Sequence, residues 1–372
     1  MPIETVNVEN FIELSTQFPV LDVRSPGEYL HAHIPKAISI PLFTDEQRKV
    51  IGTAYKQQSR QVAVNHGLDF FSERMKAIPG EIICVINSNK RDNPKDPASQ
   101  TLLIHCWRGG MRSEAVAWLL NLYGYKIYLL KGGYKSFRRW ALKQFEKKYS
   151  LKILGGYTGS GKTEVLQEMK NRGKTVIDLE ALANHKGSAF GSLGQNPQPS
   201  QEMFENLLAL EMWKTNFAKE TNHTNGVEQT NLDKEIWLED ESRHIGLAGI
   251  PPMIWEQMRH SNLYFLDIPF EQRLNFVVLQ YGDFDKKVLV TSIMKIQKRL
   301  GGLETKNAIN FLLEGNVKAC FAILIPYYDK LYTHAMNKRE NIQSLLNKIP
   351  CKSIDVNNAQ HLLQPDFFKA DT

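Results

Sequence analysis

Residues 151–163 read LKILGGYTGSGKT, a short apolar strand pattern that runs directly into the motif GxxxxGK[ST]. The backbone N–H groups of such a turn curl around phosphate oxygens, and the N-terminus of the following helix adds favourable partial charge. Lys162 is placed to reach the distal phosphate, and Thr163 to hold Mg²⁺. The glycines that shape the turn are Gly156, Gly159 and Gly161. The stretch predicts a P-loop NTPase-like α/β domain.

Further strands are expected on the C-terminal side of this turn. The apolar runs are Thr175–Leu179, Glu235–Leu238 and Leu263–Ile268. The second of them ends in carboxylates, and Glu239 and Asp240 are the candidates for the acidic partner of a metal ion. A charged surface loop is the alternative interpretation for either residue. Arg273 is a candidate lid arginine over the phosphates, or a plain surface arginine.

Two other stretches complete the expectations for this domain. Asp178 and Glu180 follow a strand, and the polar, glycine-containing run Asn184–Gly191 is suited to contacts with a ligand or a base. From Glu271 onward the pattern is mostly helical, which predicts a helical C-terminal region.

The first half of the chain also alternates strand and helix patterns, which predicts a second α/β sheet. Strands are expected at Phe18–Val23, Ile38–Leu42, Glu81–Ile86 and Leu102–His105, and helices in the insert Asp45–Phe71 and at Ser113–Leu122. The charged, proline-bearing run Lys90–Ala98 is expected to be an exposed loop.

A basic amphipathic helix at Lys135–Lys148, with Phe137, Trp140, Leu142 and Phe145 on its apolar side, is expected to connect the two halves. The domains are accordingly placed at residues 1–145 and 150–372.

The turn between the last strand and helix of the first half carries a second reactive motif. It reads His105-Cys106-Trp-Arg108-Gly-Gly-Met-Arg112-Ser. A cysteine at a strand-to-helix turn directs its sulfur at backbone N–H groups and a helix N-terminus, and Arg108 and Arg112 add positive charge. We therefore predict a thiolate at Cys106, with Arg108 and Arg112 as its catalytic partners, in a pocket that suits a persulfide, a perselenide or a phosphate group.

The remaining cysteines, Cys84, Cys320 and Cys351, have no activating neighbours, and Cys84 and Cys320 are expected in the core. With no CxxC pair, the sequence predicts neither disulfides nor a cysteine-bound metal, and we assign no residue as a permanent metal ligand.

The composition sets broad limits on the class of protein. Of 372 residues, 42% are hydrophobic and 23% charged, which is typical of a globular protein. The net charge of +6 permits a polyanionic partner without requiring one. No signal-peptide pattern and no long apolar run is visible, so we expect a cytoplasmic protein without a membrane partner.

The first half resembles the rhodanese superfamily through Asp22-Val-Arg24-Ser-Pro-Gly-Glu28, His33-Ile-Pro35 and the Cys106 turn, although Ala32 and Lys36 stand where that pattern carries glycines. The five residues between Cys106 and Arg112 match the loop length of the cysteine phosphatases related to rhodaneses. Loop length therefore leaves sulfur and phosphate chemistry both open.

The order of motifs over about Leu21–Pro326 resembles the tRNA 2-selenouridine synthase family. The motifs are CWRGGMRS, LKGGYKSFRRW, GGYTGSGKTE, DLEALANHKGSAFG and WLEDESRHIG. The resemblance implies an enzyme that replaces sulfur by selenium in 2-thiouridine at the wobble position of tRNA. It implies selenophosphate as selenium donor and an S-geranylated intermediate made from geranyl diphosphate.

On that reading the Gly156–Thr163 turn holds the pyrophosphate that leaves, with or without Mg²⁺ and without a need to hydrolyse ATP, and Cys106 carries selenium as a perselenide. The implied partners are the anticodon loop of tRNA and a selenophosphate-supplying enzyme. Residues 271–339, with scattered lysines and arginines, are the region where anticodon contacts are expected.

Three other functions are open on sequence alone. The first is an ATP-using kinase or ATPase fused to a rhodanese sulfurtransferase, supported by the complete P-loop motif. The second is a regulator that uses the P-loop as a nucleotide switch. The third is a cysteine phosphatase, for which no general acid can be placed near Cys106.

Overall fold

The structure, a computed structural model, describes residues 3–88, 100–217 and 235–363. It divides into two compact units, Met1–Lys143 and Gln144–Thr372. The exposed loop expected at Lys90–Ala98 lies outside the described residues.

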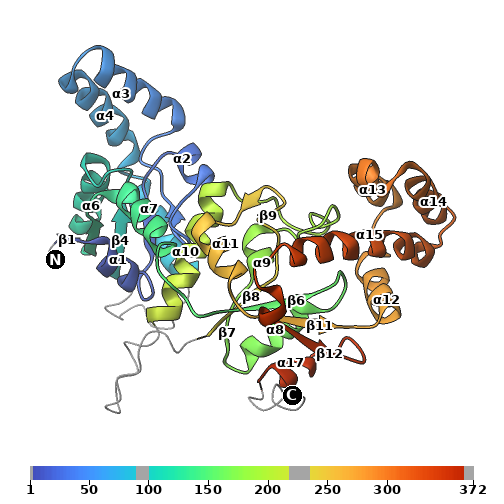
Figure 1. Ribbon diagram of the computed structural model, residues 1–372. Helices are drawn as coiled ribbons and strands as arrows, with labels where there is room; N and C mark the ends of the chain where they lie inside the picture. The colour runs from blue at the N-terminus through green and yellow to red at the C-terminus, as the bar shows by residue number, and fades with distance from the viewer. Residues whose placement is uncertain (1–2, 89–99, 218–234, 364–372) are drawn as a thin grey trace, which may run out of the picture. The chain divides into compact units, whose positions relative to one another are not determined.

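The first unit is a five-stranded parallel sheet in the order β1-β5-β4-β2-β3, with helices around it (Figure 1). The strand β4, Thr101–His105, is buried at every position, as expected for a strand of a parallel sheet covered on both faces. The other strands are β1 Ile3–Val6, β2 Val20–Asp22, β3 Ile38–Ser39 and β5 Lys126–Leu130. The helices are α1 Val8–Leu14, α2 Pro26–His31, α3 Asp45–Gln57, α4 Arg60–Arg74, α5 Ile78–Ser88, α6 Met111–Leu122 and α7 Gly133–Gln144.

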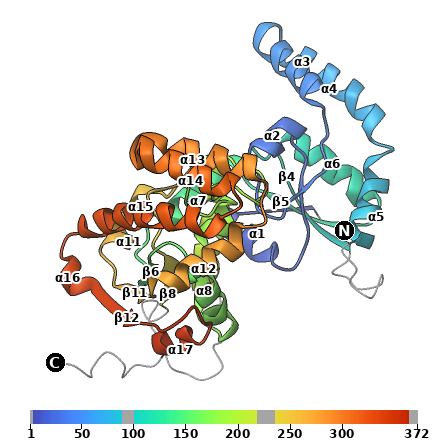
Figure 2. The ribbon, with the colours of Figure 1, turned by 90° about the vertical axis from the view of Figure 1, so that its right-hand side faces the viewer.

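The insert expected to be helical forms the pair α3 and α4, which extends away from the sheet of its unit (Figures 1 and 2). Thr44 caps α3, since its side chain accepts from the N–H of Gln47 while the Gln47 side chain accepts from the N–H of Thr44. The side chain of Ser59 caps α4 in the same way, accepting from the N–H of Val62.

The strand predicted at Glu81–Ile86 is wrong, because these residues lie in α5. Ile78 and Ile82 are fully buried one helical turn apart, whereas Ile83 is 51% exposed. An apolar run of six residues fits a buried strand and a helix equally well, and here the 3.6-residue period decides. The expectation that Cys84 is in the core is wrong for the same reason, since its position on α5 is exposed.

The basic helix expected at Lys135–Lys148 is shorter, since α7 ends at Gln144. Phe137 and Trp140 are buried as expected, as is Phe145 just after the helix, but Leu142 is 43% exposed and does not belong to the apolar face. Lys135, Arg139 and Lys143 are exposed.

The second unit is built on another five-stranded parallel sheet, in the order β12-β11-β6-β8-β7. The strands are β6 Leu151–Gly156, β7 Thr175–Ile177, β8 Ile236–Glu239, β11 Leu263–Asp267 and β12 Leu346–Pro350, with a small hairpin of β9 His244–Ile245 and β10 Ala248–Gly249. The P-loop strand β6 lies at the centre and pairs directly with β8, so the turn after β6 meets the end of β8.

Helices surround this sheet and continue into a helical group. The helices are α8 Lys162–Asn171, α9 Leu179–Ala183, α10 Gln201–Phe217, α11 Pro252–Arg259, α12 Phe270–Tyr281, α13 Lys286–Leu300, α14 Gly302–Leu313, α15 Val317–Asn337, α16 Ile342–Leu345 and α17 Asn358–Leu363. α12, α13, α14 and α15 share an apolar core of their own, which confirms the helical C-terminal region (Figure 1). α8 and α17 pack on the sheet, where Val165, Leu166 and Leu362 are buried.

The strand β12 lies in a region where only helix was expected. Its sequence, LNKIP, has one buried residue, Ile349, and it occupies the sheet edge next to β11. Pro350 ends it, a residue tolerated at an edge because it lacks the N–H that a central strand would donate. Among the described residues, no helix combines the length and the apolarity needed to cross a membrane.

Candidate active sites

The first site is the turn that holds Cys106. β4 ends at His105, Cys106 opens the turn and α6 begins at Met111. The Cys106 sulfur accepts from the hydroxyl of Ser113 at 3.2 Å and from the backbone N–H of Gly110 at 3.5 Å. The residue itself is only 3% exposed, so its sulfur lies at the base of the turn.

These donors decide the state of the thiol. Burial alone would raise the pKa of Cys106, but the hydrogen bonds from Ser113 and Gly110 and the charge of Arg112 bring that pKa below its ordinary value. The lowered pKa increases the fraction of Cys106 that is thiolate, the nucleophilic form of cysteine, at any given pH. The pKa of Cys320, which is buried without such donors, is raised to about 12.

The two arginines of the turn have different surroundings. Arg112 is half-buried, and its Nη1 donates to Oε2 of Glu28 at 2.9 Å, an ion pair that fixes the guanidinium beside the turn. Burial works to raise the pKa of Glu28, but the charge and hydrogen bond of Arg112, the N–H of Ser25 and the charge of Arg48 together outweigh it, and that pKa is lowered. Arg108 is exposed. Both were predicted partners of Cys106, and only Arg112 is among the groups that lower its pKa.

Asp22 and Arg24 form a buried ion pair next to His105, the residue that precedes Cys106. Arg24 donates to both carboxylate oxygens of Asp22 and, at 2.7 Å, to the carbonyl of Ala32, and its guanidinium lies 3.9 Å from the ring centre of Tyr134. Burial lowers the pKa of the adjacent His105, which keeps that imidazole neutral. Asp22 and Arg24, quoted from the sequence as part of a motif, are thus structural groups.

The N-terminus of α7 locks the Cys106 turn in place. The N–H of Tyr134 donates to the carbonyl of Cys106 at 2.8 Å, and the N–H of Lys135 to that of Trp107 at 3.0 Å. Gly133 has φ +58°, and a Cβ on it would lie 2.4 Å from the carbonyl oxygen of Cys106 and from the nitrogen of Gly109. Only glycine allows this approach of two backbones.

The second site is the P-loop. Gly156–Gly161 joins β6 to α8, and Nζ of Lys162 donates to the carbonyl of Gly156 at 3.2 Å, so the ammonium lies over the loop. Gly159 has φ +77°, and a Cβ there would meet Val277 at 2.6 Å and the carbonyl of Arg273 at 2.9 Å. The loop is therefore packed against α12, with its helix N-terminus and Lys162 arranged for a phosphate or diphosphate.

The two carboxylates predicted beside the P-loop are separated by the structure. Oε1 of Glu239 accepts from the hydroxyl of Thr163 at 2.9 Å, which places Glu239 at the predicted metal-binding position. Asp240 turns toward α15, where it accepts from the hydroxyl of Tyr332 at 2.6 Å and pairs with Arg339. Successive residues leaving a strand point to opposite sides, which explains the division.

Two further carboxylates lie beside Glu239. One oxygen each of Glu180, Glu239 and Glu241 lies within 4.8 Å of the others. Burial and then the charges of Glu239 and Glu241 raise the pKa of Glu180 to about 10, and burial and then Asp178 raise that of Glu239 to about 8. Lys162 acts in the opposite direction on all three carboxylates.

Arg273, the candidate lid arginine, is 4% exposed and not a surface residue. Its guanidinium pairs with both oxygens of Asp329, at 3.0 and 2.8 Å, and Nη1 also donates to the carbonyl of Thr158 in the P-loop. It contacts the loop through the backbone of Thr158, and whether it also contacts phosphate stays a prediction.

Several residues of these sites were not identified as functional from the sequence. Ser113 and Glu28 were quoted only as parts of motifs, although a hydroxyl one turn into the helix after a reactive cysteine is a signal that could have been used. Glu180 and Glu241 follow two strands that the sequence alone does not show to be neighbours. Asp329 and Tyr332 lie on α15, far along the chain, and carry no local signal.

The chain combines a turn that lowers the pKa of a cysteine with a P-loop that has a carboxylate partner. This combination is typical of two-domain proteins with a rhodanese-like part and a phosphate-binding part. The family model of the rhodanese-like domain matches residues 8–139, and that of the tRNA 2-selenouridine synthase AAA domain matches residues 149–349.

Curated relatives agree with these family models. A tRNA 2-selenouridine synthase from Nitrosomonas europaea is 33% identical over 285 residues, which cover 75% of this chain and 66% of the relative. The enzymes of that name from Shewanella denitrificans and Marinobacter nauticus are 30% and 31% identical, and the match covers 87% of this chain and 89% of each relative. The chain belongs to the tRNA 2-selenouridine synthase family. It spans just under two thirds of the Nitrosomonas protein and nearly nine tenths of the other two.

Proposed function

We propose that this protein is a tRNA-modifying selenium transferase that replaces the sulfur of a 2-thiouridine at the wobble position by selenium. The observation that carries the proposal is the pairing, in one chain of this family, of a thiolate-stabilising turn at Cys106 with a phosphate-binding loop at Lys162. A selenium donor and a diphosphate each require one of these two kinds of anion site.

The P-loop unit serves the first of two proposed steps. The sulfur of 2-thiouridine attacks C1 of geranyl diphosphate, the C–O bond breaks and pyrophosphate leaves. The backbone N–H groups of the loop, with Lys162, hold that pyrophosphate, and Thr163 and Glu239 hold any accompanying Mg²⁺. The unpartnered Oε2 of Glu239, whose side chain is fully buried, makes this pair a fitting place for the ion.

The Cys106 unit serves the second step, in which selenium enters at C2 of the base and the geranylated sulfur departs as a thiol. An alkylated sulfur is the better leaving group, which gives the first step its chemical purpose. A perselenide on Cys106 would need a two-electron oxidant, because selenophosphate carries selenium at the selenide level. We propose instead that the Cys106 thiolate attacks the phosphorus of selenophosphate: the S–P bond forms, the P–Se bond breaks, and selenium leaves as hydrogen selenide, which attacks C2 of the base. Water then hydrolyses the phosphocysteine, and the N–H groups of the turn and Arg112 hold the phosphate.

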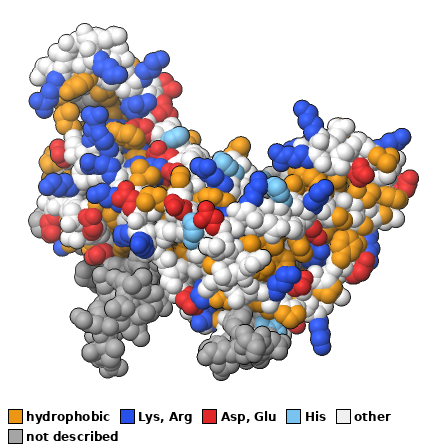
Figure 3. Space-filling view, in the orientation of Figure 1, with side chains coloured by type: hydrophobic (Ala, Val, Ile, Leu, Met, Phe, Trp, Pro, Cys, Tyr) orange, Lys and Arg blue, Asp and Glu red, His pale blue; other side chains and the backbone are white. Residues whose placement is uncertain are grey.

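Exposed basic side chains on α3 and α4, interspersed with the exposed acids Glu46, Asp69 and Glu73, are available for contacts with tRNA. Arg48, Lys49, Lys56 and Arg60 are exposed on α3 and α4, and Figure 3 shows lysine and arginine side chains gathered over this unit. Such a surface suits the phosphates of a nucleic acid.

The test is mass analysis of tRNA nucleosides from a deletion strain carrying the wild-type chain, Cys106→Ala or Lys162→Ala. We expect Lys162→Ala to stop the modification at 2-thiouridine, and Cys106→Ala to stop it at the geranylated nucleoside. Selenouridine in the strain without the gene would refute the proposal. Equal loss of both steps in folded Cys106→Ala would refute the division of labour.

The alternative function is an ATPase or kinase joined to a sulfurtransferase, and the contact of Thr163 with Glu239 is its support. ATP titrations with and without tRNA separate the two. ATP hydrolysis that keeps pace with selenation would favour the alternative and exclude a P-loop that serves diphosphate alone.

A further inference from the structure

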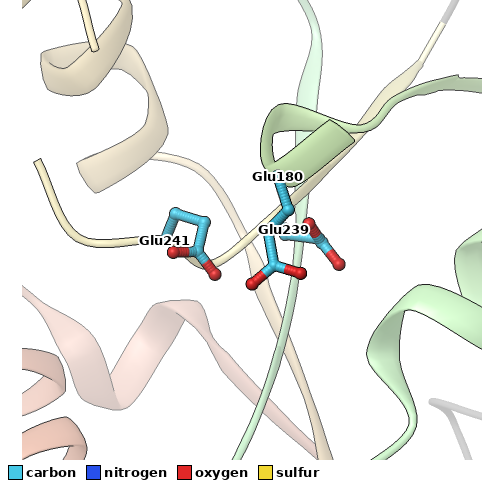
Figure 4. Close-up of side chains that lie close together, drawn as sticks. All are labelled: Glu180, Glu239 and Glu241. Atoms are coloured by element: carbon cyan, nitrogen blue, oxygen red, sulfur yellow. The ribbon is translucent and has the colours of Figure 1, made fainter. Parts of the chain in front are cut away.

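The carboxylates of Glu180, Glu239 and Glu241 converge from separate elements of the second unit (Figure 4). Glu239 ends β8, Glu241 follows two residues later, and Glu180 lies in the first turn of α9, directly after β7. Because β7 and β8 are paired in parallel, with Ile177 opposite Leu238, their carboxyl ends meet at one edge of the sheet. Sheet topology therefore gathers the three side chains.

This arrangement concentrates negative charge without a matching number of protein cations. Burial and mutual repulsion work against ionisation of all three carboxylates, and Lys162 is the one cation among the principal influences on each. Buried carboxylates are ordinarily paired with cations or coordinate metals. The protein therefore retains a group of side chains that is stable only with additional positive charge or with bound protons.

A second, independent observation points to a ligand. Glu239 is fully buried, and its Oε1 accepts from Thr163. Its Oε2 has no hydrogen-bond partner among the residues that the structure describes. A buried carboxylate oxygen with no partner is costly, because the group has lost its hydration. Glu180 and Glu241 are only partly buried, so the group is open to solvent on their side.

We propose that Glu180, Glu239 and Glu241 bind one hard divalent cation, Mg²⁺ or Mn²⁺, in the free protein. All three ligands are carboxylate oxygens, and no nitrogen or sulfur ligand belongs to the described group, which disfavours zinc and favours hard cations. Magnesium at a P-loop usually depends on one or two carboxylates plus the phosphates of the substrate. Three carboxylates supply enough charge to hold the cation before a diphosphate arrives.

The inference deepens the proposed function, since the cation, already in place beside Thr163, would form part of the surface that receives the diphosphate. The roles of Glu180 and Glu241 go beyond the usual pair of P-loop threonine and strand-end carboxylate. Their part is to hold the ion, and they need not contact the substrate.

The test is Mn²⁺ binding to the full chain without substrate, measured by the electron paramagnetic resonance signal of free Mn²⁺. We expect one bound Mn²⁺ per chain, displaced by Mg²⁺. Glu180→Gln and Glu241→Gln should each weaken binding by roughly tenfold or more, the scale on which groups around a metal change its affinity. Glu314→Gln, at an exposed position on the helical group, is the matched control and should bind as the wild type does.

Folding of the variants is checked by thermal unfolding in a chelator. The raised pKa of Glu180, about 10, means that its side chain is protonated in chelator at neutral pH. Glutamine matches that neutral form in shape, so Glu180→Gln should melt no lower than the wild type, and Mg²⁺ should raise the melting temperature of the wild type more than that of the variant. No Mn²⁺ binding, or equal binding by Glu180→Gln and the control, would overturn the inference.

A parallel titration with geranyl diphosphate separates this inference from the proposed function. Suppose that the protein binds Mn²⁺, that Glu180→Gln loses this binding, and that neither binds geranyl diphosphate. That result would refute the proposed use of the P-loop and support the cation site. Diphosphate binding of equal strength in Mg²⁺ and in chelator would overturn the role of the cation and leave the proposed function intact.

Discussion

The contact between Gly133 and the Cys106 turn can be tested by Gly133→Ala. The new Cβ would lie 2.4 Å from the carbonyl oxygen of Cys106, 2.4 Å from the nitrogen of Gly109 and 2.8 Å from that of Arg108. All three are backbone atoms, so no side-chain rotation relieves the clash, and the backbones of the turn and α7 must move apart.

Gly124→Ala provides the matched control in the same unit. Gly124 also has a left-handed φ, +88°, but a Cβ there meets nothing within 4 Å. Both alanines cost about 1–2 kcal/mol for the left-handed conformation, reduced by about 0.4–1 kcal/mol through the lower entropy of the unfolded chain. Gly133→Ala carries in addition about 1–3 kcal/mol of overpacking.

Urea unfolding followed by tryptophan fluorescence measures the free energy of unfolding, and iodoacetamide labelling of Cys106 measures the local effect. We expect Gly133→Ala to lose more stability than Gly124→Ala, and to slow Cys106 labelling at neutral pH because the Gly110 N–H is displaced from the sulfur. Equal losses of stability in the two variants, or unchanged Cys106 labelling in Gly133→Ala, would refute the argument.

Three other predictions follow from the same contacts. Ser113→Ala removes the strongest donor to the Cys106 sulfur, so the pKa of that thiol should rise and its alkylation should require a higher pH. Mass spectrometry that resolves each labelled cysteine tests this, and labelling of the exposed Cys84 should not change. Asp329→Ala leaves the buried Arg273 without its carboxylate and should cost about 3–5 kcal/mol in urea unfolding, against little change for Glu256→Ala on the exposed side of α11; equal values for the two would contradict the pairing. Lys162→Met should abolish geranyl diphosphate binding by calorimetry while leaving Cys106 labelling unchanged, and retention of diphosphate affinity would show that the ligand binds elsewhere.

The two reactive turns were predictable from sequence because each is a local motif. The residues that shape Gly156–Thr163 and Cys106–Arg112 are neighbours in the chain, and the strand before and the helix after each turn carry clear hydrophobic patterns. The conformation of α5 was not predictable, since Ile78 and Ile82 reveal a helix only when their shared burial is known.

The carboxylate group could not be predicted because it depends on sheet order. Glu180 and Glu239 are separated by a long stretch of chain, and only the pairing of β7 with β8 brings them together. The surroundings of Asp240 and Arg273 likewise depend on α15 and the residues just after it. Arg273 pairs with Asp329, and Asp240 contacts Tyr332 and Arg339. Contacts of that range leave no periodic pattern in the sequence.

The helix α15 is connected to the phosphate loop through Asp329 and Arg273, which donates to the carbonyl of Thr158. It is connected to the end of β8 through the hydrogen bond from Tyr332 to Asp240. A movement of the helical group that displaces α15 would therefore also displace the loop at Thr158, or break these hydrogen bonds. It also follows that the P-loop unit cannot be trimmed at the last recognisable motif. A chain cut before Arg339 would lose the ion-pair partner of Asp240 and keep only its hydrogen bond from Tyr332. A chain cut before Leu346 would also lose β12, the strand beside β11.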